Sequence, residues 1–281
     1  RETPLHSRLR DRNAVFGTAA GWERANWFAR SQDRPEYEYS FTRQNWFNAV
    51  GEECNAVRNT VGLFDLSSFG KTFIQGADAC AQLDRIAAAD MDRPVGSVIY
   101  TQMLNHNGGI ESDLTITRLA SDCYMAVTAA AQQARDIAWI KRNLDTAAHV
   151  FLTDVTSGYG CLALMGPHAR KVLSQLTDSG LSDDEFPFGT AQEISVGYGK
   201  AWALRITYVG ELGWELYPAA DMAGPIFDAL LDAGDKFGLR LAGYHALDSL
   251  RQEKGYRHWG HDITPADTPL EAGLGFALSK V

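Results

Sequence analysis

The chain of 281 residues has few cysteines, no long apolar run and no excess of basic residues. Its four cysteines form no Cys-x-x-Cys pair, so their spacing predicts buried thiols in a reducing compartment rather than a disulfide framework or a metal site. A formal net charge of -9 excludes an overall basic footprint for nucleic acid, although a local basic patch for an anionic ligand stays possible. No stretch predicts a membrane-spanning helix or a signal peptide, so neither nucleic acid nor membrane is expected as a partner.

Several motifs of common enzyme classes are also missing. The sequence has no Gly-x-Gly-x-x-Gly, no phosphate-binding P-loop and no Gly-x-Ser-x-Gly. These absences count against a self-contained dinucleotide enzyme, an NTPase and a serine hydrolase. The remaining composition is ordinary, and the length allows one large domain or two intertwined smaller ones. Because the chain begins at Arg1 without a methionine and stops just after an apolar run, we expect it to be a piece of a longer polypeptide.

A repeated pattern of elements predicts the fold class. Residues 1–42 have few periodic apolar positions and predict an extended arm, whereas apolar residues recurring every three or four positions from Trp46 to Val61 predict a helix. A strand–helix–strand–strand–helix unit then occurs twice, starting at Lys71 and at Cys161, and a last helix is expected near 242–256. The second strand, third strand and second helix are expected at 114–119, 123–128 and 130–144 in the first copy and at 201–208, 213–217 and 222–234 in the second. The pattern predicts an α+β fold of two related halves, each an antiparallel sheet with helices on one face.

Two segments place a carboxylate beside a glycine turn at the expected mouth of a strand. They are Asn105–Asp113 and Tyr208–Glu215. Glu215 can accept a pair of hydrogen bonds from a planar N–H edge, and Asp113 can handle a proton. If both side chains reach one cavity, the pair suits a heterocyclic amine such as a reduced folate better than a sugar, a phosphate or a nucleic acid.

Each candidate also has an ordinary structural explanation. Asp113 could cap its turn, Glu215 could be a solvated strand carboxylate, and Arg251 could pair with Asp248 or Glu253 on a solvated helix face. His258 and His261 have a spacing that occurs in metal sites. With no cysteine nearby, they instead predict a hydrogen-bonded loop, and no metal is expected.

Three blocks together resemble a known family. Asn105–Asp113, Tyr208–Glu215 and Asp248–Gly255 resemble the signature blocks of the aminomethyltransferase fold, the family of the glycine cleavage T-protein. Phe16-Gly17, Gly21–Phe28 and Tyr256–Asp262 are similar, more specifically, to the tetrahydrofolate-binding half of sarcosine and dimethylglycine dehydrogenases. The resemblance covers nearly the whole chain, with the blocks in the expected order. It implies that fold without the family's C-terminal β-rich domain. The expected division is a folate-binding domain of residues 1–70 and 150–281 and an inserted α+β domain of residues 71–149.

The resemblance also implies a role for individual residues. Asp113 is expected near the reactive folate nitrogens as the catalytic residue. Tyr208 and Glu215 are expected to hold the pterin ring, with Arg251 at the folate site and Tyr100 as a further wall of the pocket. Glycine cleavage enzymes usually carry two adjacent acids where this chain has Ser112-Asp113, which favours the dehydrogenase branch.

The function implied by the resemblance is tetrahydrofolate-dependent one-carbon transfer. A flavin domain, in the same or a partner polypeptide, would oxidise an N-methylamine such as sarcosine or dimethylglycine to its iminium, and 5,10-methylenetetrahydrofolate would form here. FAD is expected only outside this chain. The expected location is the bacterial cytoplasm or, in a eukaryote, the mitochondrial matrix. The alternatives are a stand-alone folate-dependent methyltransferase or demethylase, a glycine cleavage aminomethyltransferase, and a non-catalytic folate-binding module.

Overall fold

The computed structural model describes residues 1–278 and divides the chain into two compact units. The first unit consists of Arg1–Ser68, Ser157–Phe188 and Gln192–Tyr256, and the second of Phe69–Thr156, Gly189–Ala191 and the segment that begins at Arg257. Within residues 1–278, no helix combines the length and the apolar character needed to cross a membrane. The functional division predicted from the sequence stays a prediction, and its last three residues, 279–281, lie outside the described part of the chain.

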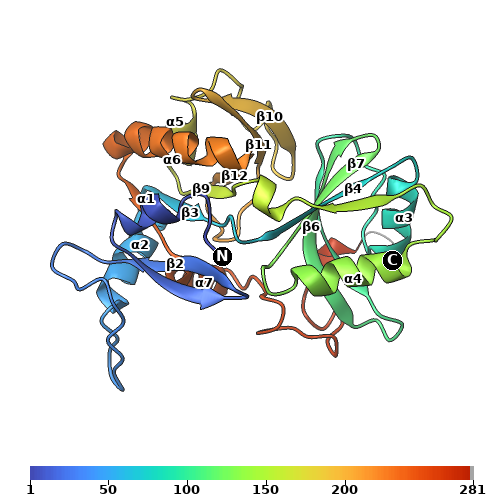
Figure 1. Ribbon diagram of the computed structural model, residues 1–281, viewed down its shortest axis with the longest axis horizontal. Coiled ribbons are helices and arrows are strands. Elements are labelled where there is room, and N and C mark those ends of the chain that lie inside the picture. The colour runs from blue at the N-terminus through green and yellow to red at the C-terminus, as the bar shows by residue number, and fades with distance from the viewer. Residues whose placement is uncertain (279–281) are drawn as a thin grey trace. The chain divides into compact units, whose positions relative to one another are not determined.

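The first unit is built on a six-stranded sheet with the strand order β10-β11-β12-β9-β3-β13. Its strands are β3 (Val61–Asp65), β9 (Leu162–Met165), β10 (Ala191–Val196), β11 (Gly199–Leu204), β12 (Gly213–Pro218) and β13 (Leu239–Leu241). Helices α5 (Ala169–Leu173) and α6 (Ala220–Gly234) cover one face and contact β11 and β12 (Figure 1). The core between them includes Leu164, Trp214 and Leu216, so β12 directs its even-numbered residues into the core and its odd-numbered residues to the other face.

Helices α2 (Phe47–Asn59) and α7 (Tyr244–Glu253) complete the first unit. The side chain of Val57 lies against Gly62 of β3, where a Cβ atom would meet it at 2.4 Å. Gly62 is on the sheet face opposite the α5 and α6 core, since its neighbours Val61 and Leu63 belong to that core. The face that carries the odd-numbered residues of β12 is therefore also covered, here by α2. Two short 3₁₀ turns, η1 (Thr156–Gly158) and η2 (Asp235–Phe237), lie in connections.

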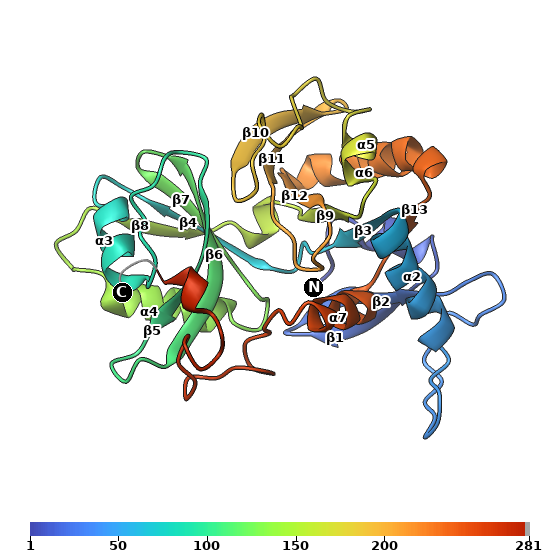
Figure 2. The same ribbon diagram turned by 180° about the vertical axis from the view of Figure 1, so that it is seen from behind.

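The N-terminal region corrects the prediction of an extended arm over residues 1–42. It contains a short helix, α1 (His6–Arg10), and a hairpin of β1 (Ala14–Ala19) and β2 (Trp22–Phe28), which contacts α7 (Figure 2). Trp22 and Trp27 are buried, so this segment forms part of the core. The prediction was wrong because the pairing shifts between Val15 and Phe16, and such an irregularity interrupts the period of two by which a strand is recognised.

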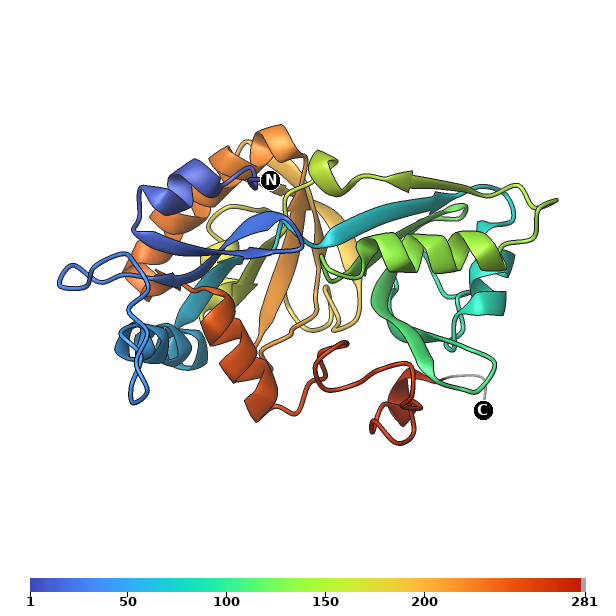
Figure 3. The ribbon, with the colours of Figure 1, turned by 60° about the horizontal axis from the view of Figure 1, so that its bottom comes forward.

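The second unit is built on a five-stranded antiparallel sheet with the order β5-β6-β7-β4-β8. Its strands are β4 (Gly70–Gln75), β5 (Val98–Leu104), β6 (Ile110–Ala120), β7 (Cys123–Thr128) and β8 (Phe151–Asp154). Helices α3 (Ala79–Ile86) and α4 (Gln133–Asn143) contribute to one core together with Leu114 and Ile116, and α4 is the green helix beside the strands in Figure 3. Asp113 and Thr115 therefore lie on the opposite face, as the alternation predicted.

The segment after Arg257 packs on the hairpin of β5 and β6. Ile263, Ala272 and Leu274 form a small core with Ile110, and Trp259 Nε1 donates a hydrogen bond to the Ile110 carbonyl at 2.8 Å. The 3₁₀ turn η3 (Gly275–Ala277) contacts β5. The chain thus forms separate sheets with helices packed against them, which confirms the predicted α+β class.

Candidate functional site

The turn between β5 and β6 is fixed by Asn105 and two glycines. The Asn105 Oδ1 accepts hydrogen bonds from the backbone N–H groups of Asn107 (2.9 Å) and Gly109 (3.0 Å). Gly108 has a φ of 81°, and a Cβ atom at Gly109 would lie 1.8 Å from the carbonyl oxygen of Pro265. The sequence therefore folds here into a tight turn that only glycine can make against the neighbouring segment.

Asp113 lies inside β6, which corrects its predicted position where the hairpin opens. The pairing with β5 already begins at Ile110, and Asp113 lies opposite Gln102. Gln102 Nε2 donates a hydrogen bond to Asp113 Oδ1 at 2.9 Å, and Tyr100 donates a second one to the same carboxylate. Two neighbouring positions of one strand face, 100 and 102, thus hold the aspartate in place, so it does not cap the turn.

The environment of Asp113 makes its carboxyl group a weaker acid than that of a free aspartate. Burial raises the pKa of Asp113 above its usual value, while the hydrogen bonds from Gln102 and Tyr100 act in the opposite direction and only partly offset it. The side chain is partly exposed. A partly accessible carboxyl group whose pKa is displaced towards neutrality can gain and lose a proton during a reaction.

Glu215 is enclosed within the first unit. It lies on β12 between β11 and β9, opposite Leu204 and Ala163, and only 6% of its surface is exposed. Its Oε2 accepts a hydrogen bond of 2.5 Å from the hydroxyl of Tyr217. The strand begins at Gly213, where a Cβ atom would lie 2.4 Å from the carbonyl oxygen of Leu164. Glu215 is therefore a buried acceptor with a fixed orientation, and the alternative of a solvated strand carboxylate is excluded.

Tyr208 lies in the loop between β11 and β12, because β11 ends at Leu204 rather than at the predicted residue 208. Its ring stacks on that of Tyr256 with 6.1 Å between centroids and 21° between planes. The same loop lines a cavity of about 260 Å³ with Arg205, Thr207 and Leu212 among its walls. A stacked aromatic pair next to such a loop can contact a flat ring system.

Arg251 lies on α7 and is buried. Its guanidinium binds Asp248 Oδ1 through Nε (2.8 Å) and Nη2 (2.7 Å), and Nη1 donates to the Tyr256 carbonyl at 3.1 Å. The sequence left a pairing with Asp248 or Glu253 open, and the structure selects Asp248. Arg251 therefore holds the backbone of Tyr256, and through it the ring that stacks on Tyr208.

The predicted candidates thus form two groups, one in each unit. The second unit brings Tyr100 and Asp113 together, and the first unit connects Tyr208 and Arg251 through Tyr256 and places Glu215 on β12. Gln102 and Tyr256 were not predicted as neighbours of these residues. Gln102 was missed because β5 was not recognised as a strand. Had it been, a period of two would have placed Gln102 on the same face as Tyr100.

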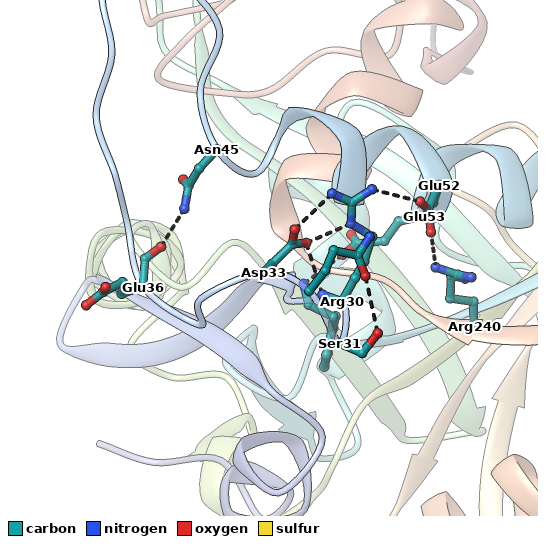
Figure 4. Close-up of polar contacts among 10 residues, drawn as sticks. Arg30, Ser31, Asp33, Glu36, Asn45, Glu52, Glu53 and Arg240 are labelled. Atoms are coloured by element: carbon teal, nitrogen blue, oxygen red, sulfur yellow. Dashed lines mark hydrogen bonds and ion pairs between the residues drawn. The ribbon is translucent and has the colours of Figure 1, made fainter.

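A second cavity of about 250 Å³ in the first unit is lined by Arg30, Glu53 and Arg240 among others. Arg30 pairs with Asp33 at 2.7 Å and with Glu52 at 3.1 Å, and Arg240 pairs with Glu52 at 2.7 Å (Figure 4). The third arginine of the lining, Arg12, donates to the carbonyl of Arg8 at 3.1 Å. Glu53 accepts hydrogen bonds from two backbone N–H groups, and its burial raises the pKa of this carboxyl to about 7. These contacts tie β2, α2 and α7 together and account for the cluster without a ligand.

The predicted hydrogen-bonded loop at His258 is present. The backbone N–H of His258 donates to Asp262 Oδ2, and the N–H of Asp262 donates to the His258 carbonyl, both at 2.9 Å. Within residues 1–278, the grouping of histidine and acidic side chains that is close enough to hold an ion is Glu2, His6 and Glu23. It lies elsewhere, and both glutamates are exposed.

Taken separately, each group contains side chains that can contact part of a reduced folate. A carboxylate can accept a pair of hydrogen bonds from the N–H edge of a pterin, and the tyrosine pair offers a flat apolar surface. In the second unit, Gln102 Oε1 is buried and lacks a hydrogen-bond partner among the described residues. These side chains offer acceptors and a flat surface of the kinds that a heterocyclic amine can use, and their role in binding one stays a prediction.

Known proteins resemble this chain along its whole length. It is 46% identical to 4-methylaminobutanoate oxidase (formaldehyde-forming) from Paenarthrobacter nicotinovorans, covering 99% of the chain and 34% of that protein. It is 37% identical to human mitochondrial sarcosine dehydrogenase, covering 98% of the chain and again 34% of the relative. The chain thus spans about a third of the length of these curated relatives.

A solved structure agrees with the sequence comparisons. The glycine cleavage system aminomethyltransferase T from Bartonella henselae superposes with a TM-score of 0.82 at 29% identity, covering 100% of this chain and 70% of the other. The family model described as GCVT N-terminal domain matches residues 5–281. The chain therefore belongs to the aminomethyltransferase family defined by the GCVT N-terminal domain, as its three sequence blocks indicated.

Proposed function

We propose that this chain is the tetrahydrofolate-dependent one-carbon transfer domain of a flavin-dependent N-methylamine dehydrogenase or oxidase. It would capture the iminium carbon of a substrate such as sarcosine or dimethylglycine as 5,10-methylenetetrahydrofolate. The observation that carries the proposal is Asp113, a partly accessible carboxyl group whose pKa is raised by burial, in a chain of the aminomethyltransferase family. The names of the two relatives, an oxidase of a methylamino acid and a sarcosine dehydrogenase, support the same substrate class.

Each unit contributes a different action in this proposal. In the first unit, Glu215 accepts hydrogen bonds from the pterin N–H edge, and Tyr208, backed by Tyr256 and Arg251, contacts the ring. In the second unit, Asp113 accepts or returns a proton and its charge favours a cationic reaction partner, while Tyr100 and Gln102 hold the carboxylate in position. Tetrahydrofolate, when bound, supplies the amine nitrogen that receives the one-carbon unit.

The oxidation belongs to a flavin domain elsewhere, in the same or a partner polypeptide. The relatives are about three times as long as the matched region, which leaves room in them for such a domain. For this chain, the flavin partner, the methylamine substrate and a location in the bacterial cytoplasm or mitochondrial matrix are all parts of the proposal.

The test separates binding from transfer. Tetrahydrofolate binding is measured by anaerobic calorimetry, and transfer is measured as the acceleration of methylenetetrahydrofolate formation from formaldehyde and tetrahydrofolate. We expect Glu215→Ala to weaken binding and Asp113→Asn to bind normally but to lose the acceleration. Matched controls are Glu193→Ala, an exposed acid paired with Lys200 in the same sheet as Glu215, and Asp122→Asn in an exposed turn of the second unit.

The outcomes distinguish the competing functions. If the chain binds tetrahydrofolate and gives no acceleration even without a mutation, it is a binding module rather than a transfer domain. If both site variants bind and react like their controls, the assignment of the site is wrong. Release of formaldehyde instead of methylenetetrahydrofolate by the complete enzyme, with tetrahydrofolate present, would contradict the proposed transfer.

A further inference from the structure

Tyr217 is the nearest described polar neighbour of Glu215 on the same strand. Its hydroxyl donates to Glu215 Oε2 at 2.5 Å, and only 1% of the Tyr217 surface is exposed. The two residues are two positions apart on β12, so alternation places both side chains on one face of the sheet. A hydrogen bond to a charged acceptor in an enclosed place is stronger than one between neutral groups.

The backbone that carries this pair is held on both sides. In the antiparallel register, Tyr217 lies opposite Trp202 of β11, and Glu215 lies opposite both Leu204 of β11 and Ala163 of β9. On the other face, Trp214 and Leu216 are fully buried in the core. The backbone of the strand therefore cannot rotate to direct Glu215 to the other face. The rotamer of the Glu215 side chain is limited in turn by its hydrogen bond with the hydroxyl of Tyr217.

The hydrogen bond also has a fixed direction. Burial raises the pKa of Tyr217 well above its usual value, and the neighbouring Cys161 and Glu215 act in the same sense. The Tyr217 hydroxyl is therefore protonated near neutral pH, and it is the donor in its hydrogen bond to the carboxylate. Donation to the ionised form of a carboxyl group favours that form.

We infer that Tyr217 is a positioning residue for ligand binding, which holds the Glu215 carboxylate in one orientation by donating a hydrogen bond to it. This inference rests on the proposed function, in which Glu215 accepts hydrogen bonds from the pterin. A merely structural tyrosine is available for comparison in the second unit. Tyr124 is equally buried, but its hydroxyl donates to the backbone carbonyl of Met91 at 3.2 Å and lies beside the thiol of Cys80 rather than beside a carboxylate.

The experiment measures the affinity for tetrahydrofolate between pH 5 and pH 8, by anaerobic calorimetry, for the native chain and for Tyr217→Phe. We expect Tyr217→Phe to bind about tenfold more weakly at neutral pH, the order expected for loss of one hydrogen bond to a charged group. The loss of affinity at low pH should also begin at a higher pH. Tyr124→Phe removes a hydroxyl of the same burial and should change neither the affinity nor its pH profile.

Two further variants make the result decisive. In a Glu215→Ala background, Tyr217→Phe should cause no further loss of affinity, because Tyr217 acts through the carboxylate. A ring-fluorinated tyrosine, introduced at position 217 alone, keeps the shape of the side chain and is a stronger donor, so it should shift the pH profile in the opposite direction. This variant also serves if Tyr217→Phe does not fold.

Failure of this inference and failure of the proposed function look different. If Glu215→Ala weakens binding while the Tyr217 variants behave like Tyr124→Phe, the positioning role is wrong and the proposed function stands. If Glu215→Ala binds as tightly as the native chain, the role proposed for Glu215 is wrong, and the positioning role is lost with it.

Discussion

The two units of this protein treat a carboxylate on an inner strand in opposite ways. Glu215 of the first unit is enclosed and accepts a hydrogen bond from Tyr217, a buried residue of its own strand. Asp113 of the second unit is partly exposed and is held by Tyr100 and Gln102 from the neighbouring strand. Both lie on the sheet face opposite a large apolar core.

Carboxylates in such different surroundings are suited to different tasks, one to binding and the other to proton transfer. An enclosed carboxylate with a fixed rotamer recognises a ligand by geometry, whereas an accessible one with a raised pKa can exchange a proton. Each unit also contains a buried acid that is fully engaged with its own protein, Glu53 in the first and Asp136 in the second. These two acids provide internal comparisons for Glu215 and Asp113, the pair proposed to act on the ligand.

The largest expected effect is that of Asp113→Asn on transfer. We expect kcat to fall about a hundred- to ten-thousandfold, as for the loss of a general acid or base, while the Kd for tetrahydrofolate changes by less than about twofold. Because burial raises the pKa of Asp113, the native kcat should decline with falling pH from a point above the ordinary range of aspartate. Stopped-flow transfer rates between pH 5 and pH 8 check this. If Asp113→Asn instead lost affinity for tetrahydrofolate and kept its transfer rate, the roles proposed for the two units would be contradicted.

The next largest effect concerns the stability of the first unit and Glu53. The pKa of Glu53 is about 7 in the folded protein and 4.5 in its unperturbed state, so between these values the native state binds more protons than the unfolded chain. The free energy of unfolding should therefore fall by about 3 kcal/mol from this group as the pH rises from 5 to 8. Urea unfolding at several pH values should show a flatter profile for Glu53→Gln. Glu52→Gln is the control, since the pKa of Glu52 is lowered and its effect lies at more acidic pH.

A smaller effect is expected from Asp136→Asn in the second unit. Asp136 on α4 accepts a hydrogen bond from Ser112 at 2.8 Å and another from Thr128, on the sheet face away from Asp113. Replacing one oxygen by an amide should cost about 1–3 kcal/mol of unfolding free energy, because a buried hydroxyl loses its acceptor. Tetrahydrofolate affinity should not change. A loss of transfer as large as that of Asp113→Asn would show that the two faces of β6 do not act independently.

The smallest effect is expected from Phe276→Ala, which tests how Tyr100 is held. The two rings stack with centroids 6.1 Å apart, but Phe276 is largely exposed. We expect the loss to be less than about 1 kcal/mol of unfolding free energy and the transfer rate to stay within about twofold. Leu270→Ala, at another exposed apolar position of the same segment, is the control. A large loss of transfer rate in Phe276→Ala would indicate that the segment around Phe276 takes part in the site and does not merely support Tyr100.

Regular patterns made the central elements of both units predictable. The apolar positions of α2 and α6 recur with the helical period, and the alternation in β12 assigned Trp214 and Leu216 to the core and Glu215 to the other face. The N-terminal hairpin was missed because its pairing is irregular, and β5 was missed because its residues show no clear alternation in polarity. Local periodicity is visible in a sequence only where one face of an element is uniformly buried.

The sequence alone determined the family, the α+β class and the identity of the acidic candidates, because three blocks of residues and two periods are local properties of the chain. The surroundings of those acids, in contrast, follow only from the folded structure. The enclosure of Glu215, the raised pKa of Asp113 and the burial of Arg251 against Asp248 depend on neighbouring strands and helices. Burial and hydrogen bonding control the chemistry of a carboxyl group, and both arise from contacts between residues that are distant in the sequence.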